Sequence, residues 1–487
     1  MKEKSAVARQ VPNPEKFAFC SGDIFCGGNQ AIISVVYLVF LTDVVGINAG
    51  VAGTIIMLSK IWDAITDPMM GILSDNARTK WGRRRPFIFW GGLLIIPAMA
   101  MMWLPVTGFS EVGKVIWVAL SYLLYYTVST CVTVPYSALS TEISTDVDER
   151  SKINLTRLLF SLSSTAICTL VPSLLFTQVS KGNLSPFLFY LIVFLGFGAF
   201  FTLPALLSAI FSHERAPLPK EKAHFSFANF VKPFKIKAFR RLLILYLAQS
   251  VTMDIVSSIV IYYAKYVQSS LSSTIFLAIF LGIQIVMFPV LNKLVTKFSK
   301  TRIYGTLLPL AILGAAGIAF YPASWNVIGL YAITAVTALG FAGAETMPWI
   351  IFPDVADIGR LGLGERITGS FSGTMTFTRK VSSAIAASII GWVLALTGYI
   401  APTSATPTPS QPENTILGIR LIICLSFALL MGVAFIVSLR FKLDGSLSKQ
   451  VKAINEKEEK GEALTEEEAQ EKEAILVSMV GGKHDKP

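Results

Sequence analysis

Residues Lys60–Phe87 read KIWDAITDPMMGILSDNARTKWGRRRPF, a stretch that starts in an apolar run and ends in a group of arginines. Its apolar part contains two acids, Asp63 and Asp67, which are four residues apart and share one face of a helix. About 20 apolar residues cross a bilayer as a helix, and arginines collect where such a helix enters the cytoplasm. The stretch therefore predicts a membrane-spanning helix with two buried carboxylates.

Composition extends this prediction to the whole chain. Its 487 residues are 53% hydrophobic and 15% charged, whereas soluble domains carry about 25% charged residues. We predict an all-α polytopic membrane protein with twelve spanning helices. The expected spans are 17–44, 50–75, 87–106, 113–142, 153–179, 186–212, 240–267, 272–296, 302–321, 325–353, 368–399 and 416–440.

The loops between these spans alternate in charge. Loops 45–49, 107–112, 322–324 and 401–415 contain no lysine or arginine, whereas the alternate set of loops carries several, among them Arg83, Lys152 and Lys297. Positive charge stays in the cytoplasm, so we expect both termini to be cytoplasmic and the protein to be a multi-pass protein of the plasma (cell inner) membrane. The net charge of +11 then reflects topology, and no nucleic-acid partner is expected.

A long basic segment divides the spans six and six. We expect a cytoplasmic N-terminus (1–16), a first half (17–212), a connector (213–239), a second half (240–440) and a charged cytoplasmic tail (441–487). The connector, basic with interleaved phenylalanines, suits the surface of an anionic membrane better than a nucleic acid. The tail is expected to be a solvated helix or disordered. Two six-helix halves are typical of transporters that work by alternating access around a midplane site.

Asp63 and Asp67 predict a cation site. A charged carboxylate at mid-bilayer costs about 2.5–3.5 kcal/mol on the translocon scale, and two on one face also repel each other. A cation between them removes both penalties, and carboxylate and hydroxyl oxygens suit hard cations such as Na⁺. Thr66 and Thr130 are the expected hydroxyl ligands. A proton shared by the two acids, or a salt bridge to a lysine or arginine, is an alternative.

Other charges in the spans are functional candidates by default. Lys380 is the expected partner of the two acids, although its neighbour Arg379 suits that role equally and a lysine can also extend to the membrane surface. Arg157 lies near the start of its span.

Two candidates for the substrate site lie in the second half. Asp254 is an isolated acid, and Trp349 stands four residues after Glu345. Aromatic rings and carboxylates together suit sugars, although aromatic residues also form belts at membrane interfaces.

A charge latch is predicted at the end of the opening stretch. Asp75 precedes the arginine group and can pair with Arg83 and Arg84, which would help to close the cytoplasmic face. The alternative is that these arginines only set the orientation of the helix.

Soluble enzyme classes are not supported. The sequence has no P-loop, no metal-ligand spacing and no convincing G-x-S-x-G, and its three histidines lie outside the spans. We expect no enzymatic activity and no cofactor other than a coupling ion, Na⁺ or H⁺.

Several motifs together resemble the glycoside–pentoside–hexuronide:cation symporters, the melibiose permease branch of the major facilitator superfamily. They are KIWDAITDPMMG, WGRRRPF, VPYSALSTEIS and PWIIFPDVADIG, with TDVVGI at 42–47. The resemblance covers nearly all of the spanning region and implies a twelve-helix fold with symport driven by Na⁺, H⁺ or Li⁺.

The resemblance also implies roles for single residues. The family's cation-site acids fall on Asp63 and Asp67, and a hydroxyl ligand falls on Thr130. The family's lysine falls on Lys380, and its helix 5 arginine falls nearest Arg157.

The family's sugar-binding acids are absent. Their positions are occupied by Gly27 and Thr133, and Asp23 with Asn29 is the expected substitute. The helix 4 motif is equally similar to that of the sodium-dependent lysophosphatidylcholine symporters of animals.

The resulting hypothesis is a monomeric secondary active symporter that imports a sugar or glycoside together with a monovalent cation. A lysolipid or other amphiphile is the alternative solute. A membrane receptor that does not transport is the alternative from a different class.

Overall fold

The computed structural model describes residues 11–140, 142–144, 146–215, 232–295, 297–363, 368–402, 408–441, 443, 445–460, 462 and 464–481. In these ranges the regular elements are helices, with one isolated bridge between Thr79 and Gly82. Twelve helices of the described residues are long and apolar enough to cross a membrane. The predicted all-α fold with twelve spans is therefore confirmed, whereas most of the predicted connector lies outside the described residues.

Contacts divide the chain into two compact units. Unit 1 comprises Met1–Phe225 and Ala387–Thr415, and unit 2 comprises Ser226–Ala386 and Ile416–Pro487. The boundary between the units in the first part of the chain falls within the predicted connector. The second boundary falls inside one helix, so that the end of the eleventh span belongs to unit 1.

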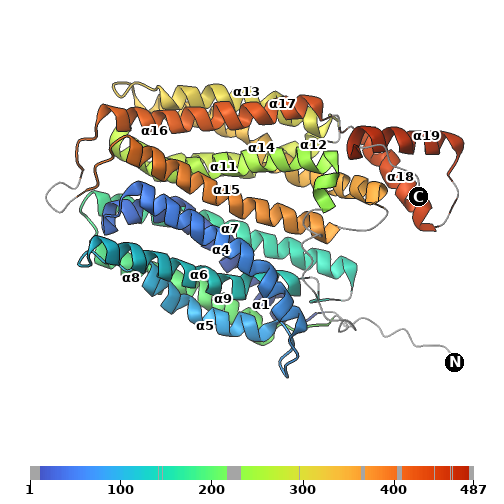
Figure 1. The fold of residues 1–487 in the computed structure, drawn as a ribbon, viewed down its shortest axis with the longest axis horizontal. Coiled ribbons are helices and arrows are strands. Elements are labelled where there is room, and N and C mark those ends of the chain that lie inside the picture. Colours follow the sequence, from blue (N-terminus) through green and yellow to red (C-terminus); the bar gives the residue numbers. More distant parts are fainter. Residues whose placement is uncertain are drawn as a thin grey trace. The chain divides into compact units, whose positions relative to one another are not determined.

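Unit 1 contains the first six spans, of which α1 to α9 run from blue to green in Figure 1. The first span is built from several consecutive helical segments, and the sixth contains a π-helical turn. The elements are α1 (Asn13–Ser21), α2 (Asp23–Ile32), η1 (Ile33–Tyr37), α3 (Leu38–Phe40), η2 (Leu41–Val45), α4 (Ala49–Asn76), α5 (Arg85–Met102), α6 (Glu111–Leu139), α7 (Val147–Ser180), α8 (Pro186–Leu191), η3 (Ile192–Phe197) and α9 (Gly198–Phe211).

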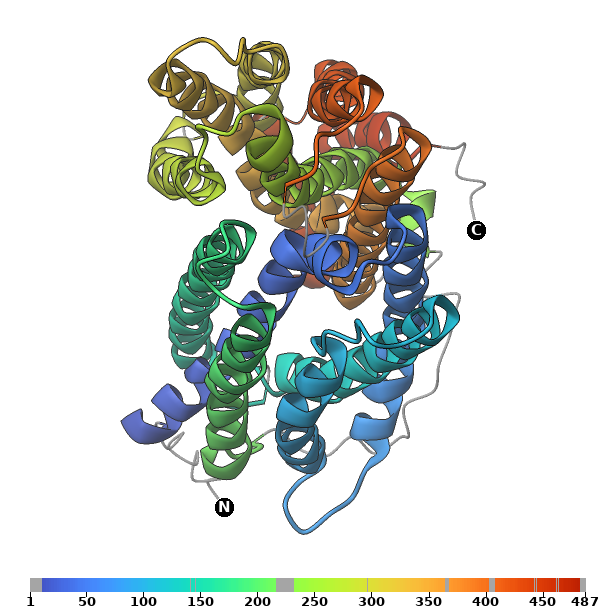
Figure 2. The same ribbon diagram turned by 90° about the vertical axis from the view of Figure 1, so that its left-hand side faces the viewer.

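Unit 2 contains the following spans and the tail. The elements are η4 (Lys232–Lys235), α11 (Lys237–Tyr262), η5 (Tyr263–Val267), α12 (Ser273–Leu294), α13 (Lys300–Ala319), α14 (Val327–Leu363), α15 (Thr368–Leu396, which ends in unit 1), α16 (Glu413–Leu425), η6 (Ser426–Met431), α17 (Gly432–Arg440), α18 (Gly445–Lys460), α19 (Glu466–Ile475) and η7 (Leu476–Val480). Figure 2 shows the helices of both units foreshortened.

Local sequence fixes where α4, the helix with the two acids, begins. Gly46 has a φ of 78°, a left-handed conformation that glycine adopts without steric cost and that ends the preceding helix. Asn48 then caps α4, because its side-chain oxygen accepts hydrogen bonds from the amides of Gly50 (2.9 Å) and Val51 (3.4 Å). These two signals set the register in which the acids of α4 face their neighbours.

An aromatic cluster packs one end of unit 1. The Tyr37 ring lies 4.7 Å from the Tyr122 ring and 5.1 Å from the Trp103 ring, measured between centroids. All three side chains are fully buried. Because large buried rings contribute strongly to packing, this cluster holds α6 against the first span.

Close helix packing in unit 2 depends on glycines. A Cβ added at Gly340 of α14 would overlap the backbone nitrogen of Ala311 in α13, and one at Gly314 of α13 would overlap the hydroxyl of Thr337. Small residues at such crossings let two helix backbones approach in the absence of a hydrophobic driving force between them. The contact between α13 and α14 therefore tolerates little added volume.

The described part of the tail is helical, which was one of the two expected forms, but it is not fully solvated. It forms α18 and α19, which Figure 1 shows beside the end of unit 2 where α14 finishes. Val451 and Ile454 of α18 are buried, and the side-chain amide of Asn455 donates to the carbonyl of Asp357 in α14 at 2.9 Å. Val480 contacts Gly362 at the end of α14. The tail has an apolar face that the high charge of its sequence conceals.

We predict that Gly340→Ala lowers the melting temperature of the purified protein by several degrees, because the added methyl group must separate α13 from α14. Overpacking of this kind costs typically about 1–3 kcal/mol. Gly282→Ala in α12 is the matched control, since a Cβ there meets nothing within 4 Å and alanine is the better helix former. Equal melting temperatures for both variants would show that the contact is not tight.

Candidate cation site and charged networks

Two helices of unit 1 bring the predicted cation ligands together. The Thr130 hydroxyl of α6 lies 2.8 Å from an oxygen of Asp63 and 3.1 Å from an oxygen of Asp67, both on α4. Thr66 lies in the same turn of α4, and its hydroxyl is 3.5 Å from that of Thr130. All four side chains named in the sequence analysis thus contribute oxygens to one cluster within the span.

Burial makes this cluster a demanding environment for charge. Asp63 and Thr130 are 2% and 1% exposed, and Asp67 is partly exposed. A threonine hydroxyl carries one hydrogen, so Thr130 can donate fully to only one of its two acids at a time. The same oxygen has lone pairs that can turn towards a cation. The donor set of two carboxylates and two hydroxyls therefore fits a small hard cation.

A cluster of this kind differs from a transition-metal centre. Among the described residues, no three histidine, cysteine, aspartate or glutamate side chains are grouped so that they could hold a metal ion. The candidate ligands at Asp63 and Asp67 are instead hard oxygens, which suit an alkali cation or a proton that is transported as a substrate.

Lys60 is a residue of α4 that the sequence analysis did not single out. It precedes Asp63 by three residues, which places both side chains on one face of the helix. The structure buries Lys60 to 3% exposure. The three-residue spacing from Asp63 could have identified Lys60 from the sequence as a positively charged side chain beside the two acids, in addition to Lys380.

Asp23 and Arg157 pair with each other in unit 1. The Arg157 Nε atom lies 3.5 Å from an oxygen of Asp23, and its guanidinium group lies 5.6 Å from the centre of the Tyr136 ring. The Tyr136 hydroxyl donates to the carbonyl of Phe19 at 2.8 Å. These contacts join α1, α2, α6 and α7, so the two predicted residues belong to one buried arrangement.

Asn29 is held by two residues of α6. Its amide nitrogen donates to Ser129 at 2.7 Å, and its amide oxygen accepts from Tyr125 at 2.6 Å. Thr133, one turn further along α6, donates to the Ser129 carbonyl of its own helix at 3.0 Å. Asn29 therefore lies next to the turn of α6 that carries Thr130, whereas the Thr133 hydroxyl is engaged with backbone.

In unit 2 the isolated acid Asp254 has a partner. Arg379 of α15 binds it with both terminal nitrogens, at 2.5 and 2.8 Å. Arg379 was a candidate partner of the α4 acids, and its pairing inside unit 2 separates it from its neighbour Lys380. Since Lys380 and the α4 acids belong to different units, the predicted link between them stays a prediction.

Trp349 of α14 packs edge-on against Tyr246 of α11, with ring centres 5.4 Å apart, and remains 53% exposed. One turn earlier on α14, Glu345 accepts a hydrogen bond from Gln249 of α11. Gln249 was missed because a single glutamine in an apolar span carries no pattern that marks it.

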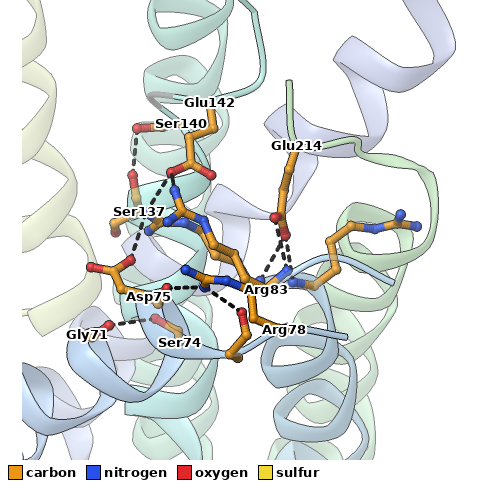
Figure 3. A network of polar contacts seen from close by, with 12 residues as sticks. Gly71, Ser74, Asp75, Arg78, Arg83, Ser137, Ser140, Glu142 and Glu214 are labelled. Carbon is orange, nitrogen blue, oxygen red and sulfur yellow. Dashed lines mark hydrogen bonds and ion pairs between the residues drawn. The ribbon is translucent and has the colours of Figure 1, made fainter. Parts of the chain in front are cut away.

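The predicted charge latch forms the centre of a larger network, shown in Figure 3. Arg83 and Arg84 both donate to one oxygen of Glu142, which lies just beyond the end of α6, and Arg84 also lies 3.0 Å from Asp75 of α4. Both arginines are only 6% exposed. The latch therefore has two acids, Asp75 on α4 and Glu142 just beyond α6. The sequence analysis named only Asp75 as a partner.

A third acid, Glu214, binds the backbone amides of the arginine group. One carboxylate, that of Glu214, accepts the amides of Arg83 at 3.0 Å and Arg84 at 2.8 Å, and Figure 3 shows it on the opposite side from Glu142. Gly82 has a φ of 103°, a conformation that glycine adopts without steric cost. A Cβ added at this position would overlap the carboxylate of Glu214, so glycine is required there.

Two further ion pairs lie at the same end of unit 1, which we term the basic end (residues 76–86, 140–152 and 212–215). Arg215 binds Glu15 at 2.6 and 2.8 Å, and this hydrogen bond raises the pKa of Arg215. Partial burial alone would raise the pKa of Glu149, but hydrogen bonds from Lys16 and Ser144 hold it below its usual value. Glu15 and Lys16 of α1 are thereby tied to the segment after α9 and to the start of α7.

Comparisons with known proteins identify the family of the chain. The family described as MFS/sugar transport protein matches residues 18–445. The putative glycoside/cation symporter YagG of Escherichia coli (strain K12) is 26% identical, over 93% of this chain and 98% of its own length. The glucuronide carrier protein homolog of the same organism is also 26% identical, over 89% and 91%.

Among solved structures, that of the nucleoside transporter NupG has a TM-score of 0.61 at 13% identity and covers 89% of this chain and 100% of its own. At that identity the likeness shows the fold alone. The fold and the match over most of the chain define a transporter of the major facilitator class, which is not an enzyme. The chain belongs to the MFS/sugar transport protein family, and the resemblance to the glycoside–pentoside–hexuronide:cation symporters is confirmed.

We predict that Thr130→Val removes the stabilisation of the purified protein by its coupling cation, whereas Thr130→Ser retains most of it. Valine has the same shape but no oxygen, so the cluster loses the group shared by both acids. Melting temperatures across a series of Na⁺ concentrations and pH values measure the effect.

The control for this prediction is Thr177→Val in α7, because that hydroxyl donates to the Ser173 carbonyl of its own helix at 2.8 Å. Unchanged cation stabilisation in Thr130→Val would exclude Thr130 as a ligand.

Proposed function

We propose that this protein is a secondary active symporter that imports a sugar or glycoside together with Na⁺ or H⁺. The observation that carries the proposal is the convergence of Asp63, Asp67 and Thr130 inside a span. Relatives that carry the names glycoside/cation symporter and glucuronide carrier homolog support this class of solute. Family membership counts against a receptor that does not transport.

The cation cluster supplies the driving force in this proposal. One monovalent ion that moves down a potential of 100 mV provides about 2.3 kcal/mol, enough for roughly fifty-fold accumulation of a neutral solute. Two ionised acids and one bound cation leave one negative charge in the span. Lys60, three residues before Asp63 on the same helix, is proposed to compensate that charge, and a role for Lys380 stays a prediction.

The solute site is proposed to include the polar groups next to the cation cluster. Asn29 is hydrogen-bonded to Ser129, the residue before Thr130 on α6, so a shift of α6 on cation binding reaches Asn29 directly. Asp23 precedes Asn29 by six residues on α2, and Thr133 lies one turn beyond Ser129 on α6. In unit 2, Asp254 and the exposed ring of Trp349 are proposed as separate solute contacts, with the indole as a stacking surface for a sugar face.

The network at the basic end is proposed to be the cytoplasmic gate. Basic residues mark the cytoplasmic side of a span, so this end is proposed to face the cytoplasm, and the cytoplasmic location of both termini stays a prediction. Glu142 joins the end of α6 to the arginines that follow α4. Breaking these contacts is expected to release the two helix ends from each other during the alternating-access cycle of a monomer in the plasma membrane.

We predict that Asp67→Asn abolishes cation-stimulated uptake into proteoliposomes while the protein still inserts and purifies normally. The amide keeps the shape of the carboxylate but loses the charge that attracts a cation. Glu111→Gln is the control, because Glu111 is exposed and pairs with Lys114 at the start of α6. Normal Na⁺- and H⁺-stimulated uptake by Asp67→Asn would refute the assignment of the cation site.

The solute is identified by a thermal-shift screen of the purified protein against sugars, glycosides and lysolipids. Each compound is tested with and without Na⁺ and at several pH values. Stabilisation by sugars or glycosides that requires the cation supports the proposal. Stabilisation by lysolipids alone would replace the proposed solute class and leave the coupling mechanism intact.

We predict that Glu142→Gln speeds amide hydrogen exchange in residues 76–86 and lowers the rate of uptake several-fold, without changing cation affinity. The amide oxygen can still accept from both arginines, but it carries no charge and its hydrogen bonds are weaker. Hydrogen-exchange mass spectrometry of the purified variant measures the first effect. If exchange and uptake both match the wild type, the arginines act only in membrane orientation.

A further inference from the structure

Glu345 is an acid of unit 2 that the proposed coupling mechanism does not use. Its polar neighbours come from α11, α13 and α15. Glu345 lies on α14 among the buried residues Gly343, Ala344 and Thr346. Gln249 of α11 donates its side-chain amide hydrogen to one carboxylate oxygen of Glu345. The carboxylate of Glu345 therefore belongs to a membrane-spanning helix, at a position where ionisation of an acid is costly.

The hydrogen-bond donor to Glu345 is neutral and fixed in orientation. Gln249 is 4% exposed, and its amide oxygen accepts from the Ser250 hydroxyl at 3.1 Å. The acceptor end of the amide is thus occupied by Ser250, which leaves the NH₂ group directed at Glu345. A neutral donor lowers the cost of a buried carboxylate only in part, because it supplies no compensating charge.

The nearby cation is committed to another acid. Arg379 forms a bidentate pair with Asp254, which is 4% exposed, at 2.5 and 2.8 Å. Planar pairs of this kind are among the strongest charge-assisted contacts, and the pair is electrically balanced. If Glu345 were also ionised, the set of Asp254, Glu345 and Arg379 would carry one uncompensated negative charge.

The other polar groups facing this set do not supply that charge. Tyr246 of α11 interacts electrostatically with Arg379, Glu345 and Asp254, and Tyr304 of α13 interacts with Glu345. Both are phenols. The packed helix α12 carries a lysine only near its end, at Lys293. Lys380 follows Arg379 directly and therefore projects about 100° further around α15.

Glu345 itself is partly exposed. Trp349, one turn further along α14, is 53% exposed, and the side chain of Arg379 is 37% exposed. The carboxylate is therefore not enclosed by protein on every side.

We propose that Glu345 is a proton-binding site of unit 2 that is distinct from the cation cluster on α4 and α6. Its ligand is a single proton, which binds to the carboxylate while the Asp254–Arg379 pair stays ionised. Protonation changes the net charge next to Trp349 by one unit. If the proposed solute site includes Trp349, solute binding will depend on pH even when the coupling ion is Na⁺.

The test is an infrared pH titration of the purified full-length protein, followed through the stretching band of protonated carboxyl groups. Buried glutamates can titrate as high as about pH 8–9, so the range runs from about pH 9 to about pH 5. We expect Glu345→Gln to lose the band of about one carboxyl group. Asp354→Asn is the control, because Asp354 of α14 is paired with Lys300 at 2.5 Å.

Two more variants separate the alternatives. Asp67→Asn is expected to keep the Glu345 band, and Glu345→Asp is expected to keep a titrating band at a shifted pH if the glutamine variant does not fold. An unchanged titration in Glu345→Gln, or loss of the same band in Asp67→Asn, would overturn the proposal. The measurement needs no transport, so its failure is distinguishable from failure of the proposed symport.

Discussion

The hydroxyl of Thr130 lies between two carboxylates whose ionised form is costly inside a membrane. The rest of unit 1 depends on this arrangement. A bilayer offers no water to solvate Asp63 and Asp67 at that depth. One threonine, Thr130, must therefore lie within hydrogen-bond distance of both carboxylates. The requirement fixes the register of α4 against α6, because a slip of one residue on either helix would turn the oxygens away from each other.

The same two helices lead to the charged network at the basic end. Asp75 lies eight residues beyond Asp67 on α4, a distance of about 12 Å along the helix axis. Glu142 follows twelve residues after Thr130, just past the end of α6. The oxygen cluster around Thr130 and the contacts of Arg84 therefore lie at two levels of the same two helices and of the segments that follow them.

Much of the fold and of the cation cluster could be predicted from sequence, because the information is local. Spans follow from runs of apolar residues, and the shared face of Asp63 and Asp67 follows from helical spacing. Thr130 was predictable from the hydroxyl-rich pattern of its helix and from the family resemblance. Each of these features depends on one helix at a time.

Pairings between helices were not predictable from spacing. Asp254 and Arg379 are 125 residues apart, and whether they meet depends on how α11 and α15 are rotated about their axes. For the same reason the partners of Asn29 and the second acid of the charge latch, Glu142, were missed. The tail was misjudged because its few buried apolar residues are diluted by charge.

Proline is distributed unevenly among the helices. The spanning helices α4, α5, α6, α7, α9, α12, α13 and α14 each contain an internal proline, whereas α11 and α15 contain none. In α4 the proline is Pro68, directly after Asp67, and it leaves the carbonyl of Ala64 without its usual amide donor. The oxygens of the cation cluster therefore lie on two helices that each contain a proline, whereas the Asp254–Arg379 pair joins two helices that contain none. Since an internal proline removes one backbone hydrogen bond, the cluster lies on helices whose hydrogen-bond ladder is interrupted, and the ion pair on helices whose ladder is not interrupted by proline.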